Sequence, residues 1–191
     1  TFMSHYKSNE LNEKNVKEKI QIITGDNNKR RCLVFLNLFI KIFRKYQEDL
    51  KSDNAIDFDD MIIDGRKNLE TQNLKYIIVD EFQDISQARA KLLKEIKDIN
   101  NAKLYCVGDD WQAINRFRGA DYNLMINFRK YLGIEKWLLN SYTRIELDET
   151  FRFNDKIAHT SQHFILKNKN QINKSLKTFH KREKPAVFLH W

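Results

Sequence analysis

Two short apolar runs, each followed closely by acidic residues, constrain the fold of this chain more than any other feature. Lys75–Asp80 consists mostly of β-branched and aromatic residues, and Lys103–Val107 repeats the pattern before Gly108. Runs of this kind are typical of strands buried on both faces of a parallel sheet. Between them, Ser86 can cap a helix over residues 87–99. This order predicts an α/β fold with an open parallel sheet, whose ligands bind at the carboxyl ends of the strands.

The first acidic cluster lies at such a strand end, where residues 79–84 read VDEFQD. A buried strand that ends in two adjacent carboxylates suits a Mg²⁺–nucleotide site. The first acid, Asp80, can hold the hydrated metal, and the second, Glu81, can polarise an attacking water. The alternative is an acidic turn that only stabilises the N-terminus of the next helix.

The second acidic cluster opens a longer polar segment, VGDDWQAINRFRGA, over residues 107–120. The Gln112 amide can hydrogen-bond a terminal phosphate or an attacking water. Polar, cationic and aromatic side chains alternate further along, an arrangement that suits phosphate contacts and stacking on bases. These side chains are Asn115, Arg116, Phe117 and Arg118. The alternative is a turn and an edge segment in which Phe117 fills the core.

Helical periodicity and capping residues predict the remaining elements. The expected helices cover residues 33–50, residues 55–63 behind an acidic cap and ending by Gly65, residues 122–132 ending at Gly133, and the segment that Asn154 caps. The first of these helices buries one face, made of Leu36, Phe39, Ile40, Phe43, Tyr46 and Leu50. Short strands are expected at residues 145–147 and 186–189. Residues 1–30 carry too few apolar positions for an assignment.

These motifs, taken in order, resemble those of the UvrD/Rep-type superfamily 1 DNA helicases, and within that group the helicase IV branch. VDEFQD is similar to the family's Walker B motif and VGDDWQAINRFRGA to its motif III. LDETFRFN, at residues 147–154, is similar to its motif IV, and DFDDM, at residues 57–61, to the segment before Walker B. The similarity extends from about residue 30 to residue 170.

The resemblance implies a partial RecA-like, P-loop NTPase helicase core that uses ATP and Mg²⁺. Asp80 would bind Mg²⁺, and Glu81 would be the general base for ATP hydrolysis. Gln112 would sense the γ-phosphate and couple it to the DNA site. Arg152 would reach the γ-phosphate from the second RecA-like domain and stabilise phosphoryl transfer.

The resemblance also implies a path from the nucleotide to single-stranded DNA. Phe117 would stack on a base, and Arg118 would link motif III to the nucleotide. Gln83 and Asp84 would belong to the coupling network. The DNA-contacting residues would be Asn115, Arg116 and Phe117. Many family members carry Tyr in place of Asn115 and Trp in place of Phe117, so stacking is expected mainly from Phe117.

One family motif is absent, because none of the five glycines is followed by Lys and the phosphate loop needs Gly-Lys-Ser/Thr. The simplest interpretation is an internal fragment that is inactive by itself. We expect a helical subdomain over residues 1–55, the remainder of the first RecA-like domain over 56–141, and the start of a second over 142–191.

Charge and cysteine usage limit the class of protein further. Residues 151–191 hold nine Lys or Arg and two acids and so supply +7 of the net charge of +8, whereas residues 51–84 are acidic. A basic region can meet a phosphate backbone, the alternative being a solvated helical surface. Cys32 and Cys106 suggest neither a disulfide nor a zinc site, and no apolar run is long enough to cross a membrane. A cytoplasmic protein is the default expectation.

The expected partners are ATP, single-stranded DNA and duplex junctions. Two other classes stay open. A nucleic-acid-binding module without nucleotide chemistry would explain the missing phosphate loop, but not the intact VDEFQD. A metal-dependent nuclease would need acids converging from several elements. His159 and His163 have the spacing of a zinc pair, but no third ligand is evident.

Overall fold

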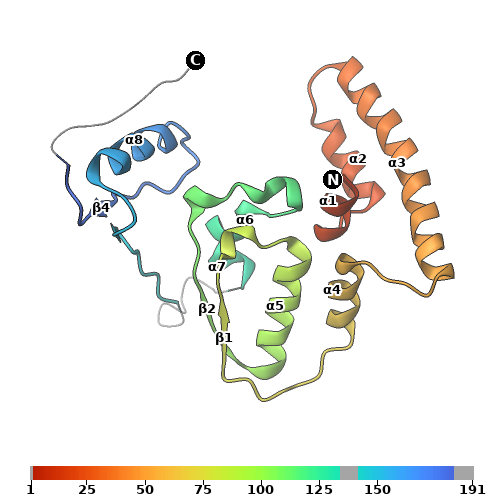
Figure 1. Cartoon of the computed structure of the whole chain (residues 1–191). Helices are drawn as coiled ribbons and strands as arrows, with labels where there is room; N and C mark the ends of the chain where they lie inside the picture. The colour runs from red at the N-terminus through yellow and green to blue at the C-terminus, as the bar shows by residue number, and fades with distance from the viewer. Residues whose placement is uncertain (1, 134–141, 183–191) are drawn as a thin grey trace. The chain divides into compact units, whose positions relative to one another are not determined.

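The computed structural model describes residues 2–133 and 142–182. The chain forms two compact units, Thr1–Leu132 and Gly133–Trp191, which are taken separately below (Figure 1). The first unit contains helices α1 to α7, strands β1 and β2, and three short 3-10 turns. The second contains strands β3 and β4 and helix α8.

The first unit is organised around a parallel strand–helix–strand element, as the sequence predicts. Strand β1 (Tyr76–Val79) pairs in parallel with β2 (Lys103–Cys106), and α5 (Gln87–Asn100) connects them. The Ser86 hydroxyl accepts a hydrogen bond from the backbone N–H of Arg89 and caps α5. Because the strands are parallel and in register, their carboxyl ends lie side by side and bring the two acidic clusters to one edge.

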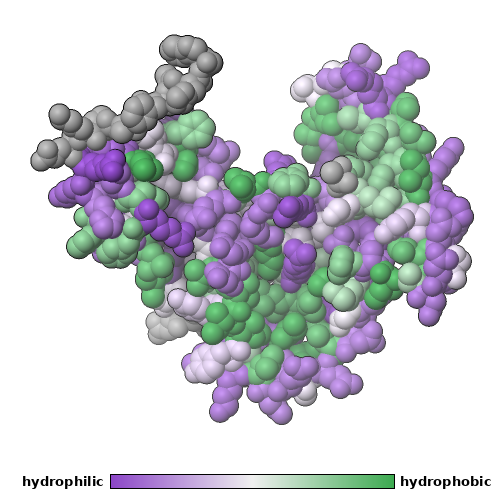
Figure 2. Space-filling view, viewed as in Figure 1, coloured by the Kyte–Doolittle hydropathy of each residue, from purple (hydrophilic) through white to green (hydrophobic). Residues whose placement is uncertain are grey.

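The two strands bury only one face, so the prediction of strands buried on both faces is wrong. Ile77 and Leu104 pack against the core that contains Phe82 and Leu93. The opposite face is exposed, through Tyr76, Ile78 and Tyr105. Figure 2 shows an apolar area over β1 and β2. Among the described residues no element covers this face, so side chains of a kind that parallel sheets normally bury lie in solvent.

The N-terminal helices build a second core. They are α1 (Phe2–Ser8), α2 (Glu13–Gln21) and α3 (Asp26–Ser52). The predicted stripe of α3 is confirmed, since Leu36, Phe39 and Ile40 are buried and Phe43 is partly buried against them. Tyr6 contacts Phe39 with 5.0 Å between the ring centroids. The first two helices escaped sequence analysis because each contributes very few buried apolar residues to this core.

Helix α4 (Phe58–Lys67) begins at the predicted acidic cap. The Asp57 carboxylate accepts a hydrogen bond from the backbone N–H of Asp60, and the Asp60 carboxylate accepts one from the backbone N–H of Asp57. The helix continues past Gly65, contrary to the expectation that it would end there. Gly65 lies inside the helix without the positive φ of a glycine that ends a helix in the left-handed conformation.

The predicted helix over residues 122–132 is broken into two short ones, α6 (Tyr122–Ile126) and α7 (Phe128–Tyr131). Its stop is confirmed, because Gly133 follows in a left-handed conformation with a φ of 65°. Both helices pack on the sheet core through Leu124 and Phe128.

The second unit contains another parallel pair, β3 (Glu149–Thr150) and β4 (Lys177–Thr178), with α8 (Asp155–Ile165) between them in the chain. Asn154 caps α8, as predicted, by accepting hydrogen bonds from Lys156 and Ile157. The strand predicted at residues 145–147 is wrong, since those residues are exposed and the strand begins only at Glu149. The strand predicted at residues 186–189 lies outside the described residues.

Candidate functional site

The carboxyl end of β1 turns sharply and leaves two carboxylates exposed. Glu81 has a left-handed backbone with a φ of 51° and a ψ of 43°. The Asp80 carboxylate accepts a hydrogen bond of 2.8 Å from the Glu81 backbone N–H. Within residues 2–133 and 142–182, no Lys, Arg or His forms an ion pair with either acid. The pair therefore keeps its negative charge available for a cation.

Gln83 joins this turn to the segment that follows β2. Its side chain is 2% exposed, and its amide nitrogen donates a 2.6 Å hydrogen bond to the Glu81 carboxylate. Its amide oxygen accepts a 2.9 Å hydrogen bond from the backbone N–H of Asp109. A Cβ at Gly108 would lie 2.9 Å from that same oxygen, so glycine leaves the room that the buried amide needs.

Asp109 extends the connection to Gln112. One carboxylate oxygen accepts a 2.7 Å hydrogen bond from the Gln112 side chain, and the other accepts one from the backbone N–H of Trp111. A continuous chain of hydrogen bonds thus runs from Glu81 through Gln83 and Asp109 to Gln112. The sequence analysis gave Asp109 no role. Its position three residues after the end of β2 and three residues before Gln112 is the signal that indicates one.

A second link joins the same two motifs through Asp84. The Asn115 side chain donates a 2.7 Å hydrogen bond to one Asp84 oxygen. The other Asp84 oxygen is buried without a hydrogen-bond partner among the described residues. The amide of Asn115 is therefore held by the Walker B-like segment, next to the residues of the predicted DNA loop.

Phe117 and Arg118 stand on the surface after Asn115. Phe117 is 62% exposed, so the alternative in which this ring fills the core is wrong. The Arg118 guanidinium carbon lies 5.4 Å from the centre of the Phe117 ring. Arg116 is also exposed. Partial burial lowers the pKa of the nearby His5, and the positive charge of Arg116 lowers it further. An exposed ring flanked by arginines can stack on a base and contact phosphate.

Arg152 belongs to the second unit. It is exposed in the segment between β3 and α8, and its backbone N–H donates to the Thr150 hydroxyl. Asp148, at the start of the same motif, forms an ion pair of 2.6 Å with Lys177. The Glu81 and Gln112 motifs thus belong to one unit, and Arg152 belongs to the other.

The remaining candidates have a simpler environment. The rings of His159 and His163 stack with 6.5 Å between centroids. In the described part of the chain, no group of three or more His, Cys, Asp or Glu residues is arranged to hold a metal ion. Burial raises the pKa of the Cys106 thiol to about 12, so it stays protonated at neutral pH. No helix among the described residues is long and apolar enough to cross a membrane.

The first unit is thus an α/β structure in which a parallel strand–helix–strand element carries linked carboxylates and amides at its strand ends. Residues 1–132 match the family model of the UvrD/REP helicase N-terminal domain. The chain therefore belongs to the UvrD/REP helicase family.

Curated relatives agree with this assignment. The chain is 37% identical to DNA helicase IV of Escherichia coli over 159 residues, which are 81% of this chain and 22% of that protein. It is 33% identical to a probable DNA helicase II homolog of Mycoplasma capricolum, over 78% of this chain and 21% of that protein. It is 29% identical to the ATP-dependent DNA helicase PcrA of Bacillus subtilis, over 72% of this chain and 19% of that protein. The chain thus spans about a fifth of the length of these relatives.

Proposed function

We propose that this chain is the part of an ATP-dependent DNA helicase that links nucleotide hydrolysis to movement along single-stranded DNA and to duplex unwinding. The observation that carries the proposal is the hydrogen-bond chain from Glu81 to Gln112, with its branch from Asp84 to Asn115. It connects a carboxylate pair suited to nucleotide chemistry with a surface loop suited to DNA. The names of the relatives support the same function, and a cytoplasmic location agrees with it.

At the nucleotide end, Asp80 holds Mg²⁺ and Glu81 acts as the general base. Exposed carboxylates without a cationic partner suit a hard cation that prefers oxygen ligands. When bound, Mg²⁺ neutralises charge on the phosphates of ATP. Gln83 orients Glu81 by donating to its carboxylate, and this leaves the second Glu81 oxygen to accept a proton from water.

At the DNA end, the loop after Gln112 contacts single-stranded DNA. Gln112 senses the terminal phosphate, and a change in its position is transmitted through Asp109 to Gln83. Phe117 stacks on a base while Arg116 and Arg118 contact the backbone phosphates. Asp84 fixes the start of this loop through Asn115, so the nucleotide and DNA ends move together.

For the complete helicase we propose the domain division that the sequence predicts. Residues 1–55 form a helical subdomain, residues 56–141 the remainder of a RecA-like parallel-sheet domain, and residues 142–191 the start of a second one. In the complete helicase, Arg152 reaches the γ-phosphate from this second domain and stabilises the transferring phosphoryl group. Because the chain contains no Gly-Lys-Ser/Thr sequence, we expect the chain alone to hydrolyse ATP negligibly.

The test measures DNA-stimulated ATP hydrolysis by the full-length protein that carries this chain, with Glu81→Gln as the variant. We expect stimulation by single-stranded DNA and a loss of roughly 10²- to 10⁴-fold in turnover for Glu81→Gln, as for removal of a general base. DNA binding should persist in the variant. Binding without any ATP turnover in the unsubstituted protein would replace the proposal with a non-catalytic binding module. DNA cleavage that needs metal but not ATP would replace it with a nuclease.

A further inference from the structure

Four consecutive residues at the end of α1, Lys7 to Glu10, contact separate parts of the first unit. The Lys7 ammonium is buried, with a side chain that is 4% exposed. It pairs with Asp57 at 2.5 Å and with Asp60 at 2.7 Å, both at the start of α4. The end of α1 is thereby fixed to the segment that precedes the Walker B-like strand.

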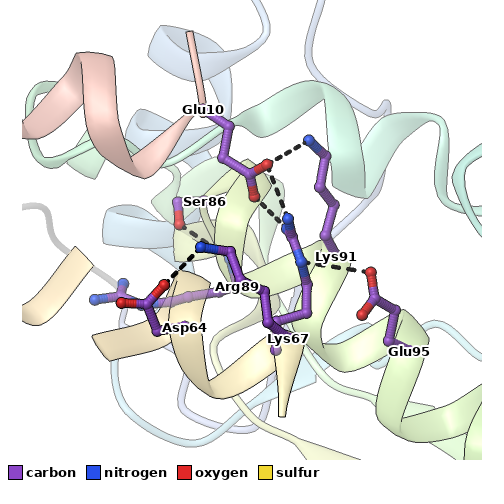
Figure 3. Close-up of polar contacts among 8 residues, drawn as sticks. Glu10, Asp64, Lys67, Ser86, Arg89, Lys91 and Glu95 are labelled. Atoms are coloured by element: carbon purple, nitrogen blue, oxygen red, sulfur yellow. Dashed lines mark hydrogen bonds and ion pairs between the residues drawn. The ribbon is translucent and has the colours of Figure 1, made fainter. Parts of the chain in front are cut away.

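Glu10 fixes the other side of this stretch (Figure 3). Its carboxylate accepts two hydrogen bonds from Arg66 of α4 and a 2.9 Å bond from Lys91 of α5. Arg66 also pairs with Glu95 of α5 at 3.4 Å. Glu10 has a left-handed backbone with a φ of 48°, so the chain reverses at the residue that carries the anchor.

Ser8 and Asn9, between these two anchors, contact the end of the predicted DNA loop. The Asn9 amide donates a 3.2 Å hydrogen bond to the Gly119 carbonyl. The same nitrogen lies 3.0 Å from the His5 carbonyl oxygen, which fixes the amide within its own helix turn. Gly119 has a φ of 96°, and a Cβ there would overlap the Ser8 side chain. Both the backbone conformation and the close packing therefore require glycine at this position.

We propose that Asn9 is a positioning residue for the loop Asn115–Gly119, which it holds through the Gly119 carbonyl against a support anchored by Lys7 and Glu10. This inference rests on the proposed function. The loop is held at its start by Asp84 through Asn115 and at its end by Asn9. Phe117 and Arg118 lie between these attachments, so their position on the surface depends on both.

The two attachments of the loop come from different parts of the first unit. Asp84 belongs to the Walker B-like segment and responds to the nucleotide. Asn9 belongs to the helical N-terminal region, whose buried anchors reach α4 and α5. The loop is thus attached at one end to the Walker B-like segment and at the other to this anchored region, and Asn9 sets how readily DNA binding stimulates hydrolysis without touching either ligand.

The first test follows hydrogen exchange of the chain in Asn9→Ala and in the matched control Asn12→Ala. Asn12 caps α2 by accepting a hydrogen bond from the backbone N–H of Asn15 and makes no contact with the loop that the structure records. We expect faster exchange over residues 113–121 in Asn9→Ala, with β1 and α5 unchanged, and no such change in Asn12→Ala. Equal acceleration in both variants, or none in either, would overturn the proposal.

The second test measures ATP hydrolysis by the full-length protein over a range of oligo-dT concentrations. For Asn9→Ala we expect the DNA concentration at half-maximal stimulation to rise roughly fivefold, the effect of one neutral hydrogen bond, with DNA-independent hydrolysis unchanged. Asn12→Ala should match the unsubstituted protein. A parallel fall in basal and stimulated rates would show a merely structural role and overturn the positioning role. Absence of stimulation in the unsubstituted protein would instead sink the proposed function, and hydrogen exchange would still decide whether Asn9 holds the loop.

Discussion

Two polar networks in the first unit both contain carboxylates and differ in the groups that those carboxylates contact. Around Lys7 and Glu10, each carboxylate meets a cation, including Arg66 and Lys91. At the strand ends, the hydrogen bonds recorded to Asp80, Glu81 and Asp84 come from backbone N–H groups and side-chain amides. Every carboxylate of the first network thus pairs with a cation, while those of the second meet neutral hydrogen-bond donors.

The difference separates a structural role from a chemical one. Burial acts to raise the pKa of Asp57, but hydrogen bonds from Lys7, the Asp60 backbone and Tyr46 outweigh it and hold that pKa below its ordinary value. A carboxylate so stabilised contributes to folding and has little left to offer a ligand. An amide donor orients a carboxylate without cancelling its charge, which suits an acid that must bind a metal ion or accept a proton.

The largest effect is expected from removing the buried cation Lys7 of the first network. Lys7→Met leaves Asp57 and Asp60 close together without the buried ammonium between them. We expect the free energy of unfolding to fall by about 3–5 kcal/mol, the usual result of breaking a buried ion pair. Urea denaturation would measure it, with the exposed Lys14→Met as the control. A loss no larger than that of the control would mean that the network does not stabilise the fold.

The next effect concerns the centre of the site network. Gln83→Leu keeps the volume of a buried side chain and removes its donor and its acceptor, leaving the Asp109 N–H without its acceptor. We expect a loss of about 1–3 kcal/mol in the free energy of unfolding. Gln72→Leu, at an exposed side chain, is the matched control. If both variants unfolded at the same urea concentration, Gln83 would not hold the two motifs together.

A smaller effect, dependent on pH, is expected at Glu10. Burial acts to raise the pKa of Glu10, but hydrogen bonds from Arg66 and Lys91 hold it below its ordinary value of 4.5. As the pH falls, the unfolded chain takes up the proton first, so the stabilisation is present above about pH 4.5 and is lost as the pH falls through the folded-state value.

Glu10→Gln should therefore cost about 1.5 kcal/mol at pH 7, as for a hydrogen bond to a charged group, and the cost should shrink in acid. Thermal unfolding of the unsubstituted protein and of Glu10→Gln would be measured between pH 7 and pH 3, and the two melting temperatures should converge as the pH falls. Glu18→Gln controls for the loss of one negative charge at an exposed position. A constant difference at every pH would contradict the role of ionised Glu10.

The smallest effect is expected in the second network, at the strand ends. Glu81→Gln retains a side-chain oxygen that can accept the hydrogen bond from Gln83. We expect the free energy of unfolding to change by less than about 0.5 kcal/mol, as for most surface substitutions. Chemical denaturation of the chain would measure this change. A loss comparable to that of Glu10→Gln would erase the distinction between the two networks.

The local elements of the fold could be predicted from sequence where one short segment carries its own signal. Strands β1 and β2 coincide with short apolar runs in the sequence, and Ser86 and Asn154 cap their helices as expected. Helices α1 and α2 have too few buried apolar residues to produce a period. The exposed face of these strands could not be predicted, because the composition of a strand shows that its side chains can be buried but not whether another element covers them.

The residues of the candidate site could be predicted as candidates because they too lie in short contiguous segments. Glu81, Gln83 and Gln112 occur in two contiguous motifs at strand ends, and the parallel register brings these ends together. A role for Asp109 could also have been predicted, because it lies only three residues after the end of β2. The contact between Asn9 and Gly119 joins residues separated by 110 positions, and no local pattern marks either partner.

The left-handed backbone of Glu81 has an evolutionary consequence. A non-glycine residue in this region costs on the order of 1 kcal/mol, whereas glycine occupies it without that penalty. Replacement by glycine at this position would therefore relax the turn and remove the carboxylate in one step. A lineage selected only for a stable fold would therefore drift toward glycine at this position, so that a carboxylate here comes at a cost in stability.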